Sequence, residues 1–422
     1  MRKSTVFEYA ESIKIKLASC LKSATMRDKK TPNAFTRAGG KLGAFNTIFL
    51  ILRGMKSSLQ STLDEFFREL CGGEIMASRQ AISVARQQVN PLYVREYFDE
   101  GVEIIAKDDT LKTFKGKRAI SVDGMDIALE NETALIAEFG CSGKNKDACT
   151  ALSSFALDIF TGVAYDCQIA PYVASERDLL NKHIVRLTEL GFQGSILIGD
   201  RGYPSYDEFM HIINSGFDFL IRLPKSYTNV ISQIENGDTL FEITNENNDK
   251  YYFRAIAVTL STGEVEYLAT SLGSDFLTPD EAKGLYGLRW GSETKYDHIK
   301  NTLELENFSG KTVNSVLQDF YATAVPANMV SCFAAVADDE IAKNDRLKPG
   351  LKYARKANRN TVARNVVLSF LVLMIEPNPI RQQREMDLIF SQITKSPVAI
   401  VPGRNPPRKQ PRKKKFNNAK RK

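Results

Sequence analysis

Four polar residues near position 290 recur at the spacing of one face of a helix. They are Tyr286, Arg289, Glu293 and Lys300, and successive members are three, four and seven residues apart. Such intervals return to the same side of an α-helix, so the four side chains are expected to share a face. A carboxylate flanked by two cations and a phenol predicts either a solvated salt-bridge ladder or a phosphate-binding surface that contains one metal-binding acid.

Two further carboxylates follow apolar segments upstream. Asp123 ends the run 119–123, and Asp200 comes shortly after the run 196–198. Both runs predict short buried strands. Each aspartate on its own is equally explained as a turn former or a helix cap. Because an unpaired buried carboxylate is energetically costly, the two acids together with Glu293 instead favour a site for divalent metal ions.

With these motifs the sequence resembles the bacterial insertion-sequence transposases of the IS-four type, a branch of the DDE transposases. The family signature around the third acid is Tyr, two residues, Arg, three residues, Glu, six residues, Lys, and 286–300 matches it without a spacing error. Trp290 and Tyr296 are aromatic where the family is aromatic, and Val-Asp-Gly and Ile-Gly-Asp-Arg-Gly-Tyr match its first two acid motifs. Residues 291–292 depart from it, being smaller than usual, which is expected to loosen local packing. The resemblance covers about residues 33–375.

The resemblance implies phosphoryl transfer with two metal ions. Two divalent ions about 3.5–4 Å apart can activate the attacking oxygen and stabilise the leaving oxygen of a phosphodiester. Hard carboxylate ligands favour Mg²⁺ or Mn²⁺. Asp123 is expected to bridge the two ions, and Asp200 and Glu293 to bind one ion each. Water would cut the first bond and the freed 3′-hydroxyl would attack target DNA, so no covalent protein–DNA intermediate is required.

Five residues around these acids are expected to contact DNA. Arg289 and Lys300 would bind phosphates of the element end, the first as a fork and the second as a point charge. Tyr286 would hydrogen-bond a phosphate. Trp290, the only tryptophan, would either stack on an unpaired base near the cut or pack its helix against the core. Arg201 would either touch DNA or pair with an acid, and the second is slightly favoured.

The charge of the chain is unevenly distributed and indicates a polyanionic partner. The 422 residues carry a net charge of +7, yet residues 1–60 carry +9, residues 402–422 carry 10 basic residues and no acid, and the stretch between them carries −12. Basic ends around an acidic body fit DNA, both the terminal inverted repeats of an element and its target. Solubility, or binding of RNA or a membrane, would also explain basic ends. Because two DNA ends must be paired, a homodimer is the expected working form.

Cysteine usage and hydropathy favour a cytoplasmic protein, and the resemblance implies a bacterial, nucleoid-associated one. The six cysteines include no Cys-x2-Cys pair, so reduced thiols are expected rather than a structural zinc site. No secretory signal is evident. The most apolar runs, 47–52 and 366–375, are too short to cross a bilayer and predict buried helix segments. The histidines His183, His211 and His298 lack metal-ligand spacing and are interpreted as non-catalytic.

The order of predicted elements is that of an α/β, RNase H-like catalytic core. Three strands, a helix, a strand, a helix and a strand are predicted between residues 119 and 223, which would give a mixed five-stranded sheet. A β-rich insertion interrupts this core, and a helical domain precedes it. The predicted domains are a helical N-terminal DNA-binding domain (1–112), the first part of the core (113–224), the β-strand insertion (225–277), the second part of the core with the C-terminal helices (278–375) and a basic, largely disordered tail (376–422).

The N-terminal domain is predicted to contain a helical pair. Ser57 or Ser58 can cap a first helix, and Ser78 can cap a second one with Arg79 and Arg86 exposed. Such a pair is compatible with a helix-turn-helix that binds DNA ends, but ordinary helical hairpins share the pattern.

Two other functions are consistent with the same acids. One is a nuclease of this fold that cuts DNA without strand transfer, and the other is a transposase-derived DNA-binding protein without catalysis. The basic face around Arg289 argues against the first, and the intact acidic trio argues against the second. The repeat sequence, the target preference and the use of hairpin ends are not encoded in any recognisable motif.

Overall fold

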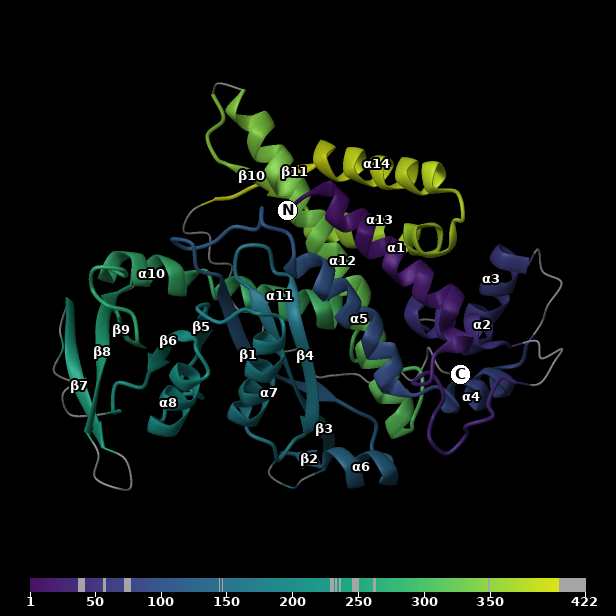
Figure 1. The fold of residues 1–422 in the computed structure, drawn as a ribbon, viewed down its shortest axis with the longest axis horizontal. Coiled ribbons are helices and arrows are strands. Elements are labelled where there is room, and N and C mark those ends of the chain that lie inside the picture. The colour runs from purple at the N-terminus through teal and green to yellow at the C-terminus, as the bar shows by residue number, and fades with distance from the viewer. Residues whose placement is uncertain are drawn as a thin grey trace. The chain divides into compact units, whose positions relative to one another are not determined.

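The chain folds into two compact units, drawn in Figure 1. The first unit comprises residues 1–110, 129–138 and 298–422, and the second comprises 111–128 and 139–297. The computed structural model describes residues 1–36, 42–55, 58–71, 77–143, 145, 147–227, 231, 234, 237–244, 250–260, 263–347 and 350–401, without the side chains of 70, 71, 292–294, 297 and 371. The predicted basic, largely disordered tail (376–422) is wrong in its first part, because Pro379–Lys395 form a helix; its residues 402–422 lie outside the described residues.

The second unit is built on a mixed sheet. In its described part the strands follow the order β2-β3-β1-β5-β6-β9-β8-β7, and β4 pairs with β3. The strands are β1 (Ala119–Ala128), β2 (Cys141–Ser142), β3 (Ala148–Asp158), β4 (Ala164–Pro171), β5 (Ile196–Gly199), β6 (Asp218–Leu223), β7 (Gly237–Thr244), β8 (Lys250–Thr259) and β9 (Val265–Thr270).

The register between β1 and β5 brings the two predicted aspartates to the same level. These strands are parallel, and Ser121 is aligned with Ile198. Asp123 and Asp200 each lie two residues further along their own chain. Strands β5 and β6 are also parallel, whereas β3 is antiparallel to both β1 and β4. The strands predicted between 119 and 223 are thus all present.

The predicted β insertion is not a separate small sheet. Strand β9 pairs antiparallel with β6, and β8 and β7 continue the same sheet beyond it. The expected five-stranded sheet therefore has nine strands in the described part of the chain. The edge of β6 offers unpaired backbone groups, which β9 satisfies. Of the turns expected in this insertion, 245–249 and 261–262 lie outside the described residues.

The single helix expected to carry Tyr286, Arg289, Glu293 and Lys300 on one face is wrong, because two helices share this segment. Helix α10 (Pro279–Gly287) ends before Arg289, and helix α11 (Trp290–Asn301) begins after it. The backbone amides of Arg289 and Gly291 bond the carbonyls three residues earlier, so the connection is a tight turn. Glycines at 284, 287 and 291 weaken a continuous helix here. Because the helical period is interrupted, the four motif residues do not share one helix face.

Two further helices of the second unit pack on its sheet. Helix α7 (Glu176–Glu189) contacts β3 and β4, and helix α8 (Tyr206–Asn214) contacts β6. Each begins at a serine whose side chain accepts the amide of the third helical residue, Ser175 for α7 and Ser205 for α8. Both helices were predicted from the sequence.

Helices form most of the first unit. They are α1 (Lys3–Ser19), η1 (Cys20–Lys22), α2 (Ala44–Arg53), α3 (Leu59–Cys71), α4 (Arg79–Gln87), α5 (Pro91–Ala106), α6 (Thr133–Phe139, which ends at the boundary of the unit), α12 (Val313–Arg346), α13 (Arg359–Ile375) and α14 (Pro379–Lys395). A short pair of strands, β10 (Arg355–Ala357) and β11 (Pro397–Ala399), accompanies them.

Helix α12 forms the core of the first unit. It contacts α1, α2, α5, α13 and α14. Its length and hydropathy are those of a membrane span, but 94% of its most apolar window is buried inside the protein. The apolar run 47–52 lies buried in α2, as predicted. The run 366–375 lies in α13, but Val367 and Leu368 are exposed, so this segment is only partly buried.

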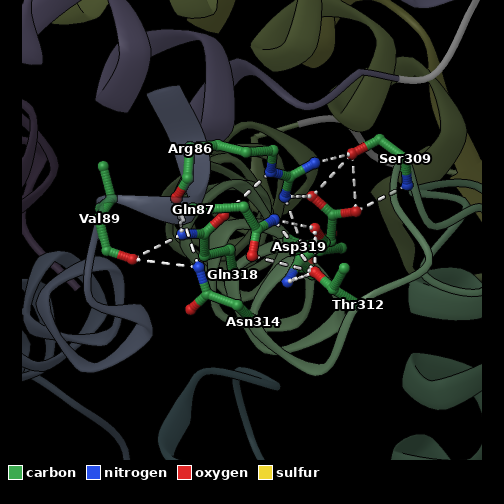
Figure 2. Close-up of polar contacts among 10 residues, drawn as sticks. Arg86, Gln87, Val89, Ser309, Thr312, Asn314, Gln318 and Asp319 are labelled. Carbon is green, nitrogen blue, oxygen red and sulfur yellow. Dashed lines mark hydrogen bonds and ion pairs between the residues drawn. The ribbon is translucent and has the colours of Figure 1, made fainter. Parts of the chain in front are cut away.

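Helix α4 is fastened to α12 by a buried polar network (Figure 2). Ser78 caps α4 as predicted. Arg86, expected to be exposed, is only 3% exposed, and its Nη2 donates to Asp319 Oδ1 over 2.8 Å. Its Nε donates to Gln318 Oε1 over 3.0 Å and its Nη1 to Ser309. A buried guanidinium requires such pairing, so Arg86 holds the helices together and is not presented to DNA. The turn expected before α4 lies largely outside the described residues.

Removing the carboxylate of this network is expected to destabilise the protein. Asp319→Ala leaves the Arg86 charge buried and unpaired, which should lower the free energy of unfolding by about 3–5 kcal/mol. Chemical denaturation measures the change. Lys311→Ala is the control in the same unit, because the ammonium group that it removes is solvent-exposed in its ion pairs with Glu130 and Glu132, and it should lower the free energy of unfolding by about 1 kcal/mol or less. Equal stability of Asp319→Ala and the parent protein would contradict this role.

Candidate functional site

Two of the three predicted acids converge on one guanidinium in the second unit. Arg289 Nη1 lies 3.2 Å from Asp123 Oδ2, and its Nη2 lies 3.9 Å from Asp200 Oδ2. Asp200 Oδ1 also lies 3.8 Å from the Nη1 of Arg222. Asp123 comes from β1 and Asp200 from the turn after β5, so the parallel register of these strands is what places them together. Both carboxylates remain partly exposed.

Arg289 is buried rather than displayed on a surface. It is 1% exposed and lies within 6 Å of both aromatic neighbours, 5.5 Å from the ring centre of Tyr286 and 5.6 Å from that of Trp290. In this arrangement the guanidinium offsets part of the negative charge of the two aspartates. A phosphate would have to compete with both carboxylates for it, so the phosphate contact expected from the sequence requires the side chain to move.

Tyr286 and Trp290 differ sharply in exposure. Tyr286 is buried and its hydroxyl donates to Asp200 Oδ1 over 3.4 Å. Burial is the main cause of its raised pKa, so the phenol is neutral and acts as a donor. Trp290 is 47% exposed, an exposure more compatible with stacking on a partner than with packing in the core. Arg201 is exposed and makes no ion pair with any described residue.

The rest of the predicted motif is not assembled around the two aspartates in the described part of the chain. Glu293 lies on α11, but its side chain is outside the described residues. Lys300, near the end of α11, belongs to the first unit, where its Nζ lies 3.3 Å from Glu306 Oε1. The distances from these two side chains to the aspartates therefore remain predictions.

The backbone of Asp123 is held by two hydroxyl groups. Ser154 Oγ and Tyr296 Oη donate to its carbonyl oxygen over 2.8 and 2.9 Å. Ser154 is in turn 2.9 Å from Nε2 of His183, whose Nδ1 lies 2.7 Å from Asp166 Oδ2. This chain is completely buried in the second unit. His183 therefore supports the strand that carries Asp123, and nothing in its spacing along the sequence indicates this role.

A fourth carboxylate, absent from the sequence motif, packs against the glycines that neighbour the two aspartates in sequence. Glu176 is the first residue of α7, and its carboxyl group faces Gly124 and Gly202. Its pKa is raised, first by burial and then by the negative charges of Asp200 and Asp126. In the sequence, only the capping Ser175 indicates this position. The acid motifs lie at strand ends, whereas Glu176 begins a helix, so the motifs do not predict it.

The oxygen donors of this site fit a divalent cation. Asp123 and Asp200 aim at one positive charge, and carboxylates are the ligands that Mg²⁺ and Mn²⁺ prefer. Among the side chains that the structure describes, no group of three His, Cys, Asp or Glu is placed to share a metal ion. A set of three ligands that includes these two aspartates therefore needs a carboxylate from outside the described side chains, and the sequence motif assigns that place to Glu293.

Comparison with known proteins identifies the class of this fold and site. The family model described as "Transposase DDE domain" matches residues 114–329, about half of the chain. The chain belongs to this family, and it is a transposase. No curated protein sequence matches it.

Among solved structures, the chain is similar to the cryo-EM structure of the piggyBac transposase synaptic complex with hairpin DNA. The sequence identity is 12%, the TM-score is 0.45, and the alignment covers 94% of this chain and 84% of that chain. A similarity this low supports no assignment of residues.

Loss of the Ser154 hydroxyl is expected to impair DNA cleavage more than DNA binding. Ser154→Ala removes one of the two bonds to the Asp123 carbonyl and leaves His183 without that partner, at a stability loss of about 1–3 kcal/mol. Ser153→Ala is the matched control, because its hydroxyl donates to the carbonyl of Met125 over 3.0 Å on the same strand. Both variants should lose similar stability, but only Ser154→Ala should lose cleavage. Equal cleavage by the two would refute the positioning role.

Proposed function

We propose that this protein is a DNA transposase that binds the ends of its element, cleaves phosphodiester bonds there and joins the freed strands to target DNA with two metal ions. One observation carries the proposal: Asp123 and Asp200, at adjacent parallel strand ends of a transposase DDE domain, converge on a single positive charge. Family membership supports the reaction class, and the convergence supports these two residues as its acids.

The catalytic core is proposed to be RNase H-like and of the IS-four type. Five strands in the order β4-β3-β1-β5-β6, with β1, β5 and β6 parallel and β3 antiparallel to its neighbours, support the first assignment. The unbroken Tyr-Arg-Glu-Lys spacing between 286 and 300 supports the second, and with it a bacterial, cytoplasmic setting. In this proposal β7–β9 are the insertion that extends the sheet.

The metal ions are proposed to be Mg²⁺ or Mn²⁺, held by Asp123, Asp200 and Glu293. When bound, they would supply the charge that activates the attacking oxygen and stabilises the leaving oxygen. Tyr286 orients the Asp200 carboxylate through its hydroxyl. Arg289 balances the acids in the absence of cations and becomes available to a DNA phosphate once they are neutralised otherwise.

DNA is the proposed partner along several parts of the chain. Lys300, the exposed Arg201 and the exposed ring of Trp290 are assigned to DNA contacts near the cleaved bond. The helical segment 1–112 is assigned to recognition of terminal inverted repeats, and the basic residues 402–422 to contacts without sequence preference. A homodimer that pairs two ends is the proposed working form.

Replacing Asp123 tests the catalytic assignment. Asp123→Asn keeps the shape of the side chain and removes one metal-binding charge, so binding to DNA from the borders of its gene should persist. Cleavage in Mg²⁺ or Mn²⁺ should fall by about 100-fold or more, since this charge acts on the reacting phosphate. Asp207→Asn, an exposed acid on α8, is the control and should cleave normally.

Gel-shift, nicking and strand-transfer measurements on the same DNA separate the possible outcomes. Full cleavage by Asp123→Asn would overturn the assignment. Nicking without strand transfer by the parent protein would identify a nuclease, and binding without any metal-dependent nicking would identify a catalytically silent protein.

Competition between Arg289 and cations gives a second test. Arg289→Gln should lower the melting temperature of the DNA-free protein in chelator, because Asp123 and Asp200 lose the guanidinium that they share and only Asp200 keeps a second cation, Arg222. The rise in melting temperature on adding Mn²⁺ should be larger than in the parent protein, because the ion no longer displaces a guanidinium. Arg201→Gln removes a neighbouring exposed charge and should change neither quantity. A smaller Mn²⁺ effect in Arg289→Gln would argue against competition.

A further inference from the structure

We infer that Glu176 is a fourth acidic residue of the cation site: together with Asp200 it binds a divalent cation, and the buried hydroxyl of Tyr203 hydrogen-bonds the carboxylates that hold the ion. The inference rests on the proposed function, because it concerns a cation of the same site. It adds a ligand from the start of a helix to acids that come from strand ends and α11.

The Glu176 carboxylate is not used by its own helix. Helix α7 is capped by Ser175, which accepts the amide of Asp178, while the Asp178 carboxylate accepts the amide of Ser175. This reciprocal pair satisfies the helix end without Glu176. The Glu176 side chain makes no hydrogen bond or ion pair with any residue that the structure describes. It is thus a half-buried carboxylate with no cationic partner in that part of the chain.

Two glycines leave the space that this carboxylate occupies. A Cβ atom at Gly124 would lie 2.5 Å from Oε1 of Glu176, and one at Gly202 would lie 2.6 Å from Oε2. Neither glycine has a φ in the left-handed region, so the backbone conformation does not demand glycine there. Glycine is needed there because any side chain would collide with the Glu176 carboxylate. Gly124 directly follows Asp123, and Gly202 comes two residues after Asp200, so both acid motifs contain a residue that makes room for Glu176.

A buried hydroxyl group without a hydrogen-bond partner lies within electrostatic range of the same carboxylate. Tyr203 is 0% exposed, and its hydroxyl has no hydrogen-bond partner among the described residues. Its strongest electrostatic neighbour is Glu176, followed by Asp123, and Asp200 is also within range. Leaving a buried hydroxyl unsatisfied typically costs about 1–3 kcal/mol. A third glycine, Gly199, allows this ring to pack closely, because a Cβ there would lie 2.9 Å from Tyr203 Cδ2.

Asp200 is the acid that Glu176 shares with the rest of the site. Neighbouring residues of a strand point to opposite faces, so the open side of Gly124 and the side chain of Asp123 lie on opposite faces of β1. Asp200 lies in the turn after β5 and is a neighbour of both Arg289 and Glu176. Arg289 and Arg222 lie near Asp200, whereas Glu176 has no cationic partner among the described residues and is repelled by Asp200. A divalent cation between Asp200 and Glu176 removes that repulsion and gives the Tyr203 hydroxyl an ordered acceptor.

Cation binding to the DNA-free, full-length protein tests the inference without any activity measurement. Mn²⁺ is titrated by calorimetry into the parent protein and into Glu176→Gln, Glu176→Asp and Tyr203→Phe. Both Glu176 variants should bind about 10- to 100-fold more weakly, and Tyr203→Phe should weaken binding less. Asp178→Asn removes the same charge from the same helix end, away from the two glycines, and should bind like the parent protein.

Stability in chelator separates a ligand from a structural residue. Without cations, Glu176→Gln should melt at or above the temperature of the parent protein, because it relieves repulsion with Asp200. In saturating Mn²⁺ the order should reverse. A lower melting temperature of Glu176→Gln under both conditions would indicate a structural role and overturn the inference.

The controls also separate failure of this inference from failure of the proposed function. Parent-like affinity of Glu176→Asp, which keeps the charge and shortens its reach, would overturn the inference, as would parent-like affinity of Glu176→Gln. If Asp200→Asn loses Mn²⁺ while the Glu176 variants keep it, the inference fails and the proposed function stands. If the parent protein itself binds no Mn²⁺, both fail.

Discussion

The parallel pairing of β1 with β5 is the constraint on which the candidate site depends. Aligning Ser121 with Ile198 carries Asp123 and Asp200 to the same level of two neighbouring chains, although they are far apart in the sequence. A shift of one residue would turn one aspartate to the other face of the sheet. The hydrogen bonds that Ser154 and Tyr296 donate to the Asp123 carbonyl fasten this arrangement from the adjoining strand and from α11.

Once the carboxylates are brought together, their charge has to be balanced. Arg289 supplies that balance from the turn between α10 and α11, almost completely shielded from solvent. The turn therefore has a structural role: it sets the position of the Arg289 side chain, which a continuous helix would have placed on the same face as the other motif residues. The glycines interrupt the helix, and the turn that results places the buried guanidinium where it offsets part of the negative charge of the two aspartates.

Glycine has a second role in the acid motifs themselves. Gly124, Gly199 and Gly202 do not adopt left-handed backbone conformations, yet each faces a side chain that any larger residue would displace. The displaced groups are the carboxylate of Glu176 and the ring of Tyr203. In sequence each motif looks like a strand followed by a turn. In the structure its glycines also let the first residue of α7 and the ring of Tyr203 pack closely against the backbone.

Local patterns in the sequence were enough to predict the strands that carry Asp123 and Asp200 and the helices α4, α7 and α8 with their capping serines. These features depend on apolar runs and on hydrogen-bonding side chains within a few residues. Tertiary structure alone decided the rest. The edge of β6 was available to β9, so the expected insertion extended the sheet. Asp319 lay opposite Arg86, so an arginine expected on the surface became a buried support. Glu176 and His183 acquired their places only when α7 packed on the sheet, because charge and space at a site are set by residues that meet across the fold.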